Sequence, residues 1–219
     1  MPKRPVICVS IINDDMATIK KFEPLADFFE VRIDLLGKGW KEVAVALNKP
    51  WLACNRRPEE GGKWRGNEAD RIKELLTAIG MGARVIDIEL STPGLAKVVK
   101  EIKGKAECLI SYHNYKDTPQ EKLREIVRLE LDACADTCKV VTTARSFADN
   151  IAVLQLIKEF PGIKIVAFAM GAEGQISRVL CPLLGGSFTY ASMGSGKESA
   201  AGQIGVEDLR RIYRMLQEG

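Results

Sequence analysis

The sequence predicts a single (β/α)8 barrel, an α/β fold that spans residues 1–219 as one domain. Short runs rich in Val, Ile and Phe alternate with helix-length stretches in which apolar residues recur every three or four positions. Eight such strand–helix pairs follow one another, and this alternation requires parallel strands joined by helical crossovers. An open doubly wound sheet is the alternative. Eight near-equal units without a glycine-rich dinucleotide fingerprint favour closure into a barrel.

The same pattern places each element along the chain. The expected strands are residues 6–11, 28–36, 51–56, 84–90, 108–113, 139–143, 164–170 and 187–193. The expected helices are residues 14–25, 41–47, 67–80, 93–102, 119–135, 146–160, 172–184 and 206–216. Thr118, which precedes a proline, and Ser146 are typical helix N-caps, and Gly104 and Gly185 stand near helix ends as C-cap residues do.

Composition and charge argue against several classes of protein. The chain has 32 Lys and Arg against 29 Asp and Glu, and the net charge of +3 gives no reason to expect a nucleic-acid or membrane partner. No apolar run has the length of a membrane span, and the N-terminus leads directly into a strand-like run without the pattern of a signal peptide. The six cysteines lack the spacing of a redox or metal motif, and there is one histidine. We therefore expect a cytoplasmic protein without a metal site.

Charged residues interrupt several expected strands near their C-terminal ends. Glu30, Arg32 and Asp34 alternate with aliphatic residues, so the period of two places the three charges on one face. An antiparallel sheet with one hydrated face gives the same alternation, but the interleaved helices favour a barrel with the charges pointing inward. The other strands contribute Arg56, Asp87, Glu89, His113 and Lys139. Because active sites of such barrels lie at the C-terminal ends of the strands, these residues mark the site.

Lys139 and His113 are the candidates for chemistry. Lys139 lies within an apolar strand, where desolvation favours the neutral amine that can attack a carbonyl. The alternative is a lysine whose stem is buried and whose ammonium group reaches the edge of the barrel. His113, the only histidine, ends the preceding strand and suits proton transfer near neutral pH. A lone histidine is more often structural, but its place one unit before Lys139 favours catalysis.

Two glycine-rich loops and one arginine complete the set of candidates. Glu60 lies in the first loop, and the second covers residues 194–203. In the second loop Lys197 is followed by Glu198, where a phosphate-binding loop needs Ser or Thr, so a mobile lid over the barrel mouth is favoured over that motif. A plain surface loop is the alternative. Arg178, near the start of the seventh helix, is suited to bind a carboxylate, although a solvent-facing arginine is the default.

Taken together, these residues resemble the type I 3-dehydroquinase family over residues 30–203. Six motifs of the family occur here in the family's order, and the six together are far more specific than any one of them. They are Glu30-x-Arg32-x-Asp34, Arg56-x3-Glu60-Gly61-Gly62, Ser111-Tyr112-His113, Lys139, Met170-Gly171-x2-Gly174-x2-Ser177-Arg178 and Ser199-Ala200-Ala201-Gly202-Gln203. The chain departs from the family pattern at three positions. Ala201 replaces a lid proline, Cys54 stands where a threonine is expected, and Phe168 replaces a methionine.

The resemblance implies a lyase that dehydrates 3-dehydroquinate to 3-dehydroshikimate in the shikimate pathway of aromatic amino acid biosynthesis. It assigns the Schiff base to Lys139, proton transfer to His113 and the positioning of that histidine to Glu60. The residues that it assigns to substrate binding are Glu30, Arg32, Arg56, Arg178, Ser199 and Gln203. No metal or cofactor is required. The expected partners are the small-molecule substrate and a second copy of the chain in a homodimer.

Two other functions are compatible with the pattern. Another Schiff-base barrel, such as an aldolase or transaldolase, also uses a lysine on the sixth strand, but usually binds a phosphate group near strands seven and eight. A non-catalytic barrel that binds a small acid is the alternative from another class. The presence of both Lys139 and His113 argues against it.

Overall fold

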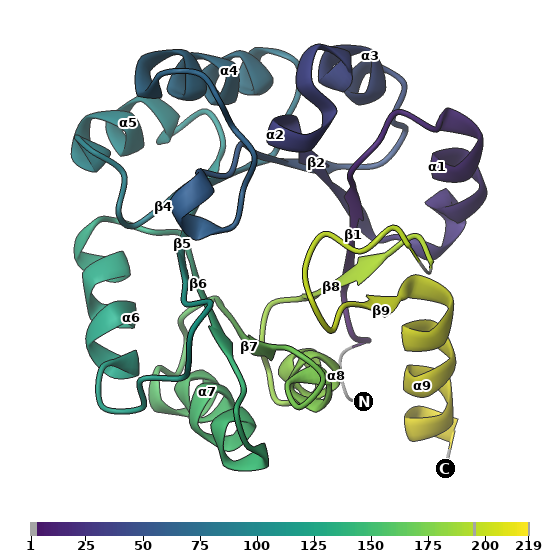
Figure 1. The fold of residues 1–219 in the computed structure, drawn as a ribbon, viewed down its shortest axis with the longest axis vertical. Helices are drawn as coiled ribbons and strands as arrows, with labels where there is room; N and C mark the ends of the chain where they lie inside the picture. The colour runs from purple at the N-terminus through teal and green to yellow at the C-terminus, as the bar shows by residue number, and fades with distance from the viewer. Residues whose placement is uncertain (1–3, 195, 219) are drawn as a thin grey trace.

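The computed structural model describes residues 4–194 and 196–218 of the chain. In Figure 1, eight parallel strands curl around a common axis in chain order. These strands are β1 (Ile7–Ile11), β2 (Phe28–Arg32), β3 (Trp51–Cys54), β4 (Val85–Glu89), β5 (Glu107–His113), β6 (Thr137–Thr143), β7 (Ile165–Met170) and β8 (Thr189–Ser192). Because β1 pairs with β2 on one side and with β8 on the other, the first and last of these strands are neighbours. The predicted (β/α)8 barrel is confirmed.

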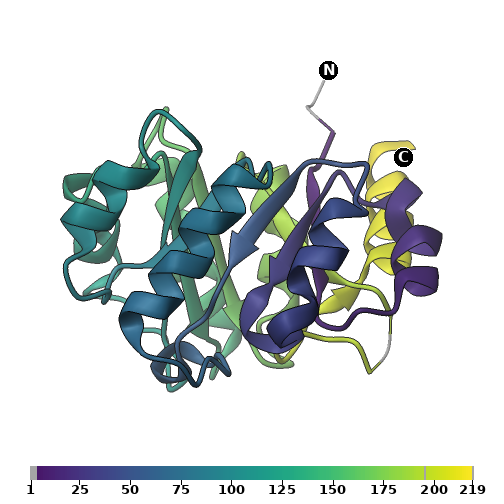
Figure 2. The ribbon, with the colours of Figure 1, turned by 90° about the horizontal axis from the view of Figure 1, so that it is seen from above.

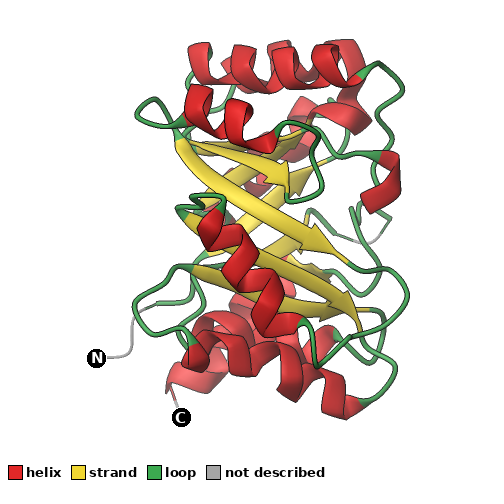
Figure 3. Ribbon diagram, turned by 90° about the vertical axis from the view of Figure 1, so that its left-hand side faces the viewer, coloured by secondary structure: helices red, strands yellow, loops and turns green. Residues whose placement is uncertain are grey.

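The helices lie on the outer side of the strands, as Figures 2 and 3 show from two directions. They are α1 (Met16–Phe22), α2 (Ile33–Leu36), α3 (Trp40–Val45), α4 (Glu68–Gly80), α5 (Leu95–Ile102), α6 (Leu123–Asp132), α7 (Phe147–Glu159), α8 (Gln175–Leu183) and α9 (Val206–Glu218). Short 3-10 turns occupy Glu23–Leu25, Gly37–Gly39 and Pro58–Glu60. The expected cap of α7 is confirmed, because Ser146 forms a capping box with Asp149. No helix within the described ranges combines the length and the apolar character of a membrane span.

The seam of the barrel lies between β7 and β8. There the Ser187 amide donates to the Ile165 carbonyl at 2.7 Å, at the N-terminal ends of the two strands. At the other end of β8, the sequence missed a short strand, β9 (Ile204–Gly205), which pairs in parallel with Ala191 and Ser192. Since β1 occupies one edge of β8, β9 occupies the edge at the seam. The segment that precedes β9 is thereby held at the mouth of the barrel.

The second expected strand was too long. It ends at Arg32, and the next four residues form α2 instead of continuing the strand to residue 36. Asp34 therefore does not lie on the strand. In the helical turn it accepts two hydrogen bonds from Arg32, at 2.9 and 2.8 Å, and a third from the Lys63 amide at 3.0 Å. These three bonds to a buried carboxylate give a physical reason for the turn at this point.

Side chains alternate along the strands between an inner and an outer apolar layer. In β1, Cys8 faces the inner layer, whereas Ile7 and Val9 pack with residues of the surrounding helices. The inner layer consists of Cys8, Leu52, Cys54, Leu109, Val141, Val166, Phe168, Met170, Phe188 and Tyr190. The barrel interior is thus a packed core, and the buried charges stand at its C-terminal end.

Gly174, at the start of α8, is packed so closely against β7 that a side chain does not fit. A Cβ atom there would lie 2.4 Å from the Ala169 carbonyl oxygen and 2.5 Å from that of Met170. Gly174→Ala should therefore lower the free energy of unfolding by about 1–3 kcal/mol, the usual cost of overpacking. The matched control is Gly80→Ala, because a Cβ at the end of α4 meets nothing within 4 Å. Urea unfolding followed by circular dichroism would measure both, and equal midpoints for the two variants would contradict the prediction.

Candidate active site

Eight of the nine predicted site residues line one cavity at the C-terminal ends of the strands. These eight are Glu30, Arg32, Arg56, His113, Lys139, Arg178, Ser199 and Gln203. The ninth, Glu60, lies behind His113 and bonds to it. The cavity is also lined by Phe168, Met170 and Ala200. Three further lining residues, Tyr115, Val141 and Tyr190, were not singled out from the sequence. Strands β2, β5, β6, β7 and β8 and the loops that follow β3 and β8 all contribute to the site.

Lys139 projects from the middle of β6 into the barrel and is 4 % exposed. Its Nζ donates to Asp87 Oδ2 at 2.8 Å and to the Tyr190 hydroxyl at 3.0 Å. The surroundings of this lysine are therefore less apolar than its sequence neighbours suggest. The Asp87 carboxylate compensates the charge of this side chain inside the barrel, and only an unprotonated amine can act as a nucleophile.

Asp87 is the centre of a buried chain of ion pairs. Arg56 Nη2 approaches the same Asp87 Oδ2 at 2.7 Å, and Ser111 donates to the second oxygen at 2.7 Å. Arg56 Nη1 also lies 3.2 Å from Glu89, which in turn binds Arg71 of α4 at 2.7 Å. Burial raises the pKa of Asp87, but the charges of Arg56 and Lys139 outweigh burial and hold this pKa well below its usual range. Asp87 is therefore a permanent anion beneath the cavity.

His113 ends β5, and a carboxylate holds its ring from behind. Its Nδ1 lies 2.9 Å from Glu60 Oε2, and Ser91 donates to the other Glu60 oxygen at 2.7 Å. Burial, followed by the positive charges of Arg56 and Lys139, lowers the pKa of His113 well below its usual value. A neutral ring with its Nδ1 hydrogen on Glu60 leaves Nε2 unprotonated, so this nitrogen can accept a proton.

The surroundings of Glu60 disfavour its ionised form. Burial, only partly offset by the charge of Arg56 and the Ser91 hydrogen bond, raises the pKa of Glu60 to about 7. Its ionisation, and with it the hydrogen bond that orients His113, therefore responds to pH near neutrality.

Arg178 of α8 is buried and, among residues 4–194 and 196–218, forms none of the ion pairs that surround Arg32 and Arg56. Its Nη2 donates to the Ala201 carbonyl at 3.2 Å, and its guanidinium lies 4.4 Å from the centre of the Phe168 ring. Its Nε has no hydrogen-bond partner among the described residues. Burial lowers the pKa of Arg178 to about 10. A buried, incompletely satisfied guanidinium on the cavity wall is suited to an anionic group of a ligand.

The segment 194–203 lies over the cavity, with Ser195 outside the described residues. The Ser199 amide donates to Gln203 Oε1 at 2.7 Å, and Gln203 Nε2 donates to Ser10 at 3.3 Å. Lys197 binds Asp15, the N-cap of α1, at 2.9 Å. Ser199 and Gln203 thus reach the cavity in the position that the lid hypothesis requires.

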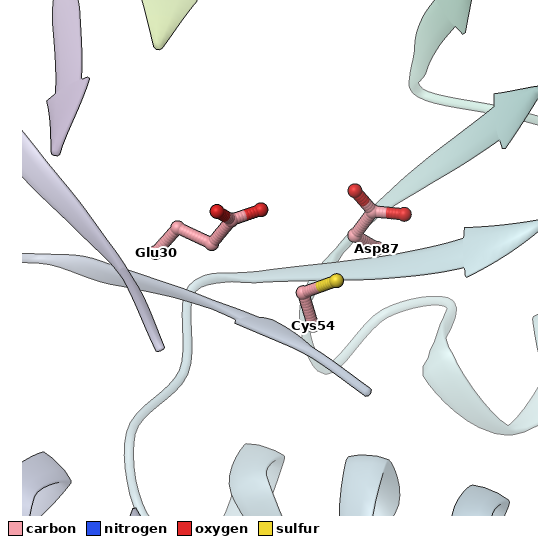
Figure 4. Close-up of side chains that lie close together, drawn as sticks. All are labelled: Glu30, Cys54 and Asp87. Atoms are coloured by element: carbon pink, nitrogen blue, oxygen red, sulfur yellow. The ribbon is translucent and has the colours of Figure 1, made fainter. Parts of the chain in front are cut away.

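Glu30, Cys54 and Asp87 converge from three neighbouring strands, as Figure 4 shows. One potential ligand atom of each lies within 4.8 Å of the others, the spacing of a metal site. However, Asp87 already binds Arg56 and Lys139, and Glu30 accepts a hydrogen bond from Ser10 at 2.7 Å. Burial also raises the pKa of the Cys54 thiol well above its usual value, so a metal-binding thiolate is disfavoured. Because Asp87 is engaged in ion pairs, Glu30 accepts a hydrogen bond and Cys54 is a neutral thiol, the three residues are poorly suited to hold a cation.

Sequence reasoning missed two polar residues of the site, Tyr190 and Ser10, and placed a third, Asp87, at the site without giving it a role. Asp87 was visible as a charge on an expected strand, but nothing in the sequence indicated that it binds Lys139. Tyr190 and Ser10 gave no signal, because a tyrosine or a serine in an apolar strand is common in cores. Only the strand order brings β1 and β8 together and places both residues beside the cavity.

Fold and site together define an enzyme class: a (β/α)8-barrel lyase with a buried lysine, a histidine–carboxylate pair and an arginine at the mouth. The model of the type I 3-dehydroquinase family matches residues 7–219, and the chain belongs to this family. A 3-dehydroquinate dehydratase of Dehalococcoides mccartyi is 49 % identical over 213 residues, which cover 97 % of this chain and 96 % of the relative. The dehydratase of Methanocaldococcus jannaschii is 36 % identical, with 96 % and 99 % covered. The crystal structure of the Geobacillus kaustophilus enzyme has a TM-score of 0.84 at 26 % identity, with 98 % and 91 % covered.

The raised pKa of Glu60 has a consequence for stability. Below about pH 4.5 this carboxyl is protonated in both the folded and the unfolded chain, whereas between about pH 4.5 and 7 only the unfolded chain ionises. The wild type should therefore lose stability relative to Glu60→Gln as the pH rises through this window, by roughly 3 kcal/mol at pH 8. Urea unfolding at pH 4.5 and 8 would measure the difference. Glu59→Gln removes the same charge at an exposed neighbour and is the control. A constant difference between wild type and Glu60→Gln would contradict the prediction.

Proposed function

We propose that this chain dehydrates 3-dehydroquinate to 3-dehydroshikimate through an imine formed by Lys139. The observation that carries the proposal is the position of the Lys139 amine. It lies in the same cavity as His113 and Arg178, at the C-terminal end of the barrel. The names of the relatives support the substrate, and the residues of the cavity support the route.

The cavity supplies groups for each polar part of the substrate. Arg178, whose Nε has no partner in the part of the chain that the structure describes, would bind the substrate carboxylate, and Ser199 and Gln203 of the lid would close over it. Glu30, Arg32 and Arg56 would hold the ring hydroxyl groups. Asp34 fixes the Arg32 guanidinium through two hydrogen bonds, so this arginine is orientated before the substrate arrives.

The imine lowers the barrier to proton removal. The neutral Lys139 amine adds to the ketone carbon, and the resulting carbinolamine loses water to form an iminium ion. This cation withdraws electrons from the neighbouring carbon, so the carbanion that forms when the proton leaves is stabilised as an enamine. Asp87 below Nζ provides a negative charge that stabilises the iminium ion as it forms.

His113 would move the proton. Its unprotonated Nε2 takes the proton from the carbon next to the iminium, and Glu60 stabilises the imidazolium that results. The enamine then expels the β-hydroxyl group, which leaves as water with the proton that His113 returns. Hydrolysis of the remaining iminium ion releases 3-dehydroshikimate and restores the Lys139 amine. The net change is the loss of one water molecule.

Location and assembly follow as part of the same proposal. All six cysteines are free and five of them are buried, which suits the reducing cytoplasm. We also propose a homodimer. Phe147 and Ile151 lie one turn apart on α7 and are 62 % and 52 % exposed, an apolar pair that a second copy of the chain would cover.

The imine predicts a covalent mark on one lysine. Borohydride reduction in the presence of 3-dehydroquinate should attach a ligand-derived mass to the peptide that contains Lys139, as measured by mass spectrometry. Lys139→Ala should abolish both the mark and turnover. Lys164→Ala, at a lysine with a 58 % exposed side chain, is the control and should retain both. Turnover without a mark on Lys139 would rule out the imine.

The role of His113 predicts a different defect. His113→Ala should lower turnover by about a hundredfold or more, because proton transfer loses its base. Lys139 is intact in this variant, so the imine should still form and should accumulate when the substrate is added. Intact-mass spectrometry after borohydride would detect the accumulated adduct. Near-normal turnover would show that His113 is structural.

A further inference from the structure

Tyr190 of β8 is the second partner of the Lys139 amine. Its hydroxyl lies 3.0 Å from Nζ, its ring centre lies 4.3 Å from the same atom, and the residue is 4 % exposed. Phe188 and Phe168 hold the ring from two sides in edge-to-face contacts, with centroids 5.3 and 6.1 Å away. The hydroxyl is therefore fixed in place, and it meets the atom that would react.

We infer that Tyr190 is a positioning residue that, together with Asp87, directs the lone pair of the Lys139 amine into the cavity. The inference rests on the proposed function, because it concerns the step in which the imine forms. It assigns a role to a residue that the proposed mechanism has not used.

The nitrogen of the Lys139 side chain is tetrahedral. The ammonium form of Lys139 has three hydrogens, and two acceptors of the protein, Asp87 and Tyr190, lie within hydrogen-bond distance. When the third proton leaves, the two N–H groups can keep these acceptors. The lone pair then takes the remaining direction, towards the cavity that Lys139 and Tyr190 both line. Two acceptors thus fix the rotation of the amine, which one acceptor does not.

Asp87 alone cannot supply this orientation. The oxygen that binds Lys139 also binds Arg56, at 2.7 Å, and the other oxygen accepts from Ser111. With Tyr190 absent, the amine would keep a single anchor and could rotate about the bond between Cε and Nζ. With one N–H held by Asp87, the lone pair can take either of the two remaining staggered directions, and one of these directs a hydrogen, instead of the lone pair, at the substrate carbonyl.

The tyrosine acts as a hydrogen-bond acceptor and not as a base. Burial, reinforced by the negative charges of Glu30 and Asp87, raises the pKa of Tyr190 well above its usual value, so the phenol remains neutral. A neutral phenol accepts a hydrogen bond through an oxygen lone pair and keeps its own hydrogen. Its effect is therefore on the orientation of the amine.

The role of Tyr190 is confined to one stage of the reaction. An iminium nitrogen has one hydrogen and no lone pair, so the orientation of a lone pair is irrelevant once the imine exists. Removal of the hydroxyl should slow the formation of the imine and leave proton abstraction by His113 unchanged. A general loosening of the site would slow both steps.

Tyr190→Phe tests the inference, because it removes the hydroxyl and keeps the ring. In single-turnover experiments with borohydride trapping, the rate of adduct formation at Lys139 should fall about tenfold, the scale of one lost hydrogen bond. With a substrate deuterated at the carbon that loses its proton, the isotope effect on turnover should be smaller than for the wild type, because imine formation becomes rate-limiting.

Tyr213→Phe is the matched control. This tyrosine of α9 is 3 % exposed, its hydroxyl donates to the backbone carbonyls of Val179 at 3.1 Å and Arg178 at 3.5 Å, and it does not line the cavity. The variant removes an equally buried hydroxyl and should form the adduct at the wild-type rate. A wild-type rate in Tyr190→Phe, or an unchanged isotope effect, would overturn the inference while the imine mechanism stands. A wild type that forms no adduct at Lys139 would overturn the imine mechanism, and the inference with it.

Discussion

One carboxylate, Asp87, organises the interior of this barrel. A lysine and an arginine can be buried side by side only if a negative charge compensates both, because an unpaired charge in the core costs several kcal/mol. Asp87 Oδ2 binds Lys139 at 2.8 Å and Arg56 at 2.7 Å. Arg56 also touches Glu89, and Arg71 of α4 binds Glu89 from outside the barrel. The candidate nucleophile is thus connected through ion pairs to a helix on the surface.

Arg178 is the exception, because no carboxylate of the described residues compensates its charge. This difference separates an arginine suited to bind a ligand from the arginines that stabilise the fold through ion pairs. The arginines at positions 32, 56 and 71 each have a carboxylate within 3.2 Å. Arg178 is equally buried, but its bond in the described structure is to the Ala201 carbonyl, and its Nε has no partner there. A positive charge in such a place is stabilised when an anionic ligand arrives. Arg178 is therefore the arginine of the site that we expect an anionic ligand to bind.

The sequence predicts those parts of the site that follow from the spacing of apolar and charged residues and from the order of strands and helices along the chain. Strict alternation of strands and helices indicated the barrel, and charges at strand ends indicated Lys139 and His113. The helical turn after Arg32 was not predictable in the same way, because the bonds that Asp34 makes to Arg32 and to the distant Lys63 amide decide it. Tyr190 depends on strand order as well, since β8 meets Lys139 only across the barrel interior. Local patterns predict elements, and contacts across the barrel complete the site.

The lid shows why one departure from the family pattern is compatible with an intact site. Ala201 stands where the pattern has proline, yet its side chain is exposed and the loop is held through its carbonyl. That oxygen accepts hydrogen bonds from the Gly171 amide at 3.2 Å and from Arg178 at 3.2 Å. The next residue, Gly202, has φ +74°, and a Cβ there would lie 2.3 Å from the Gly171 carbonyl oxygen. The position of Ala201 and Gly202 is thus set by backbone contacts, which alanine provides as well as proline does. Arg178 bonds the Ala201 carbonyl of this loop and also lines the cavity. An anion bound to its guanidinium would therefore contact the same side chain that holds the loop.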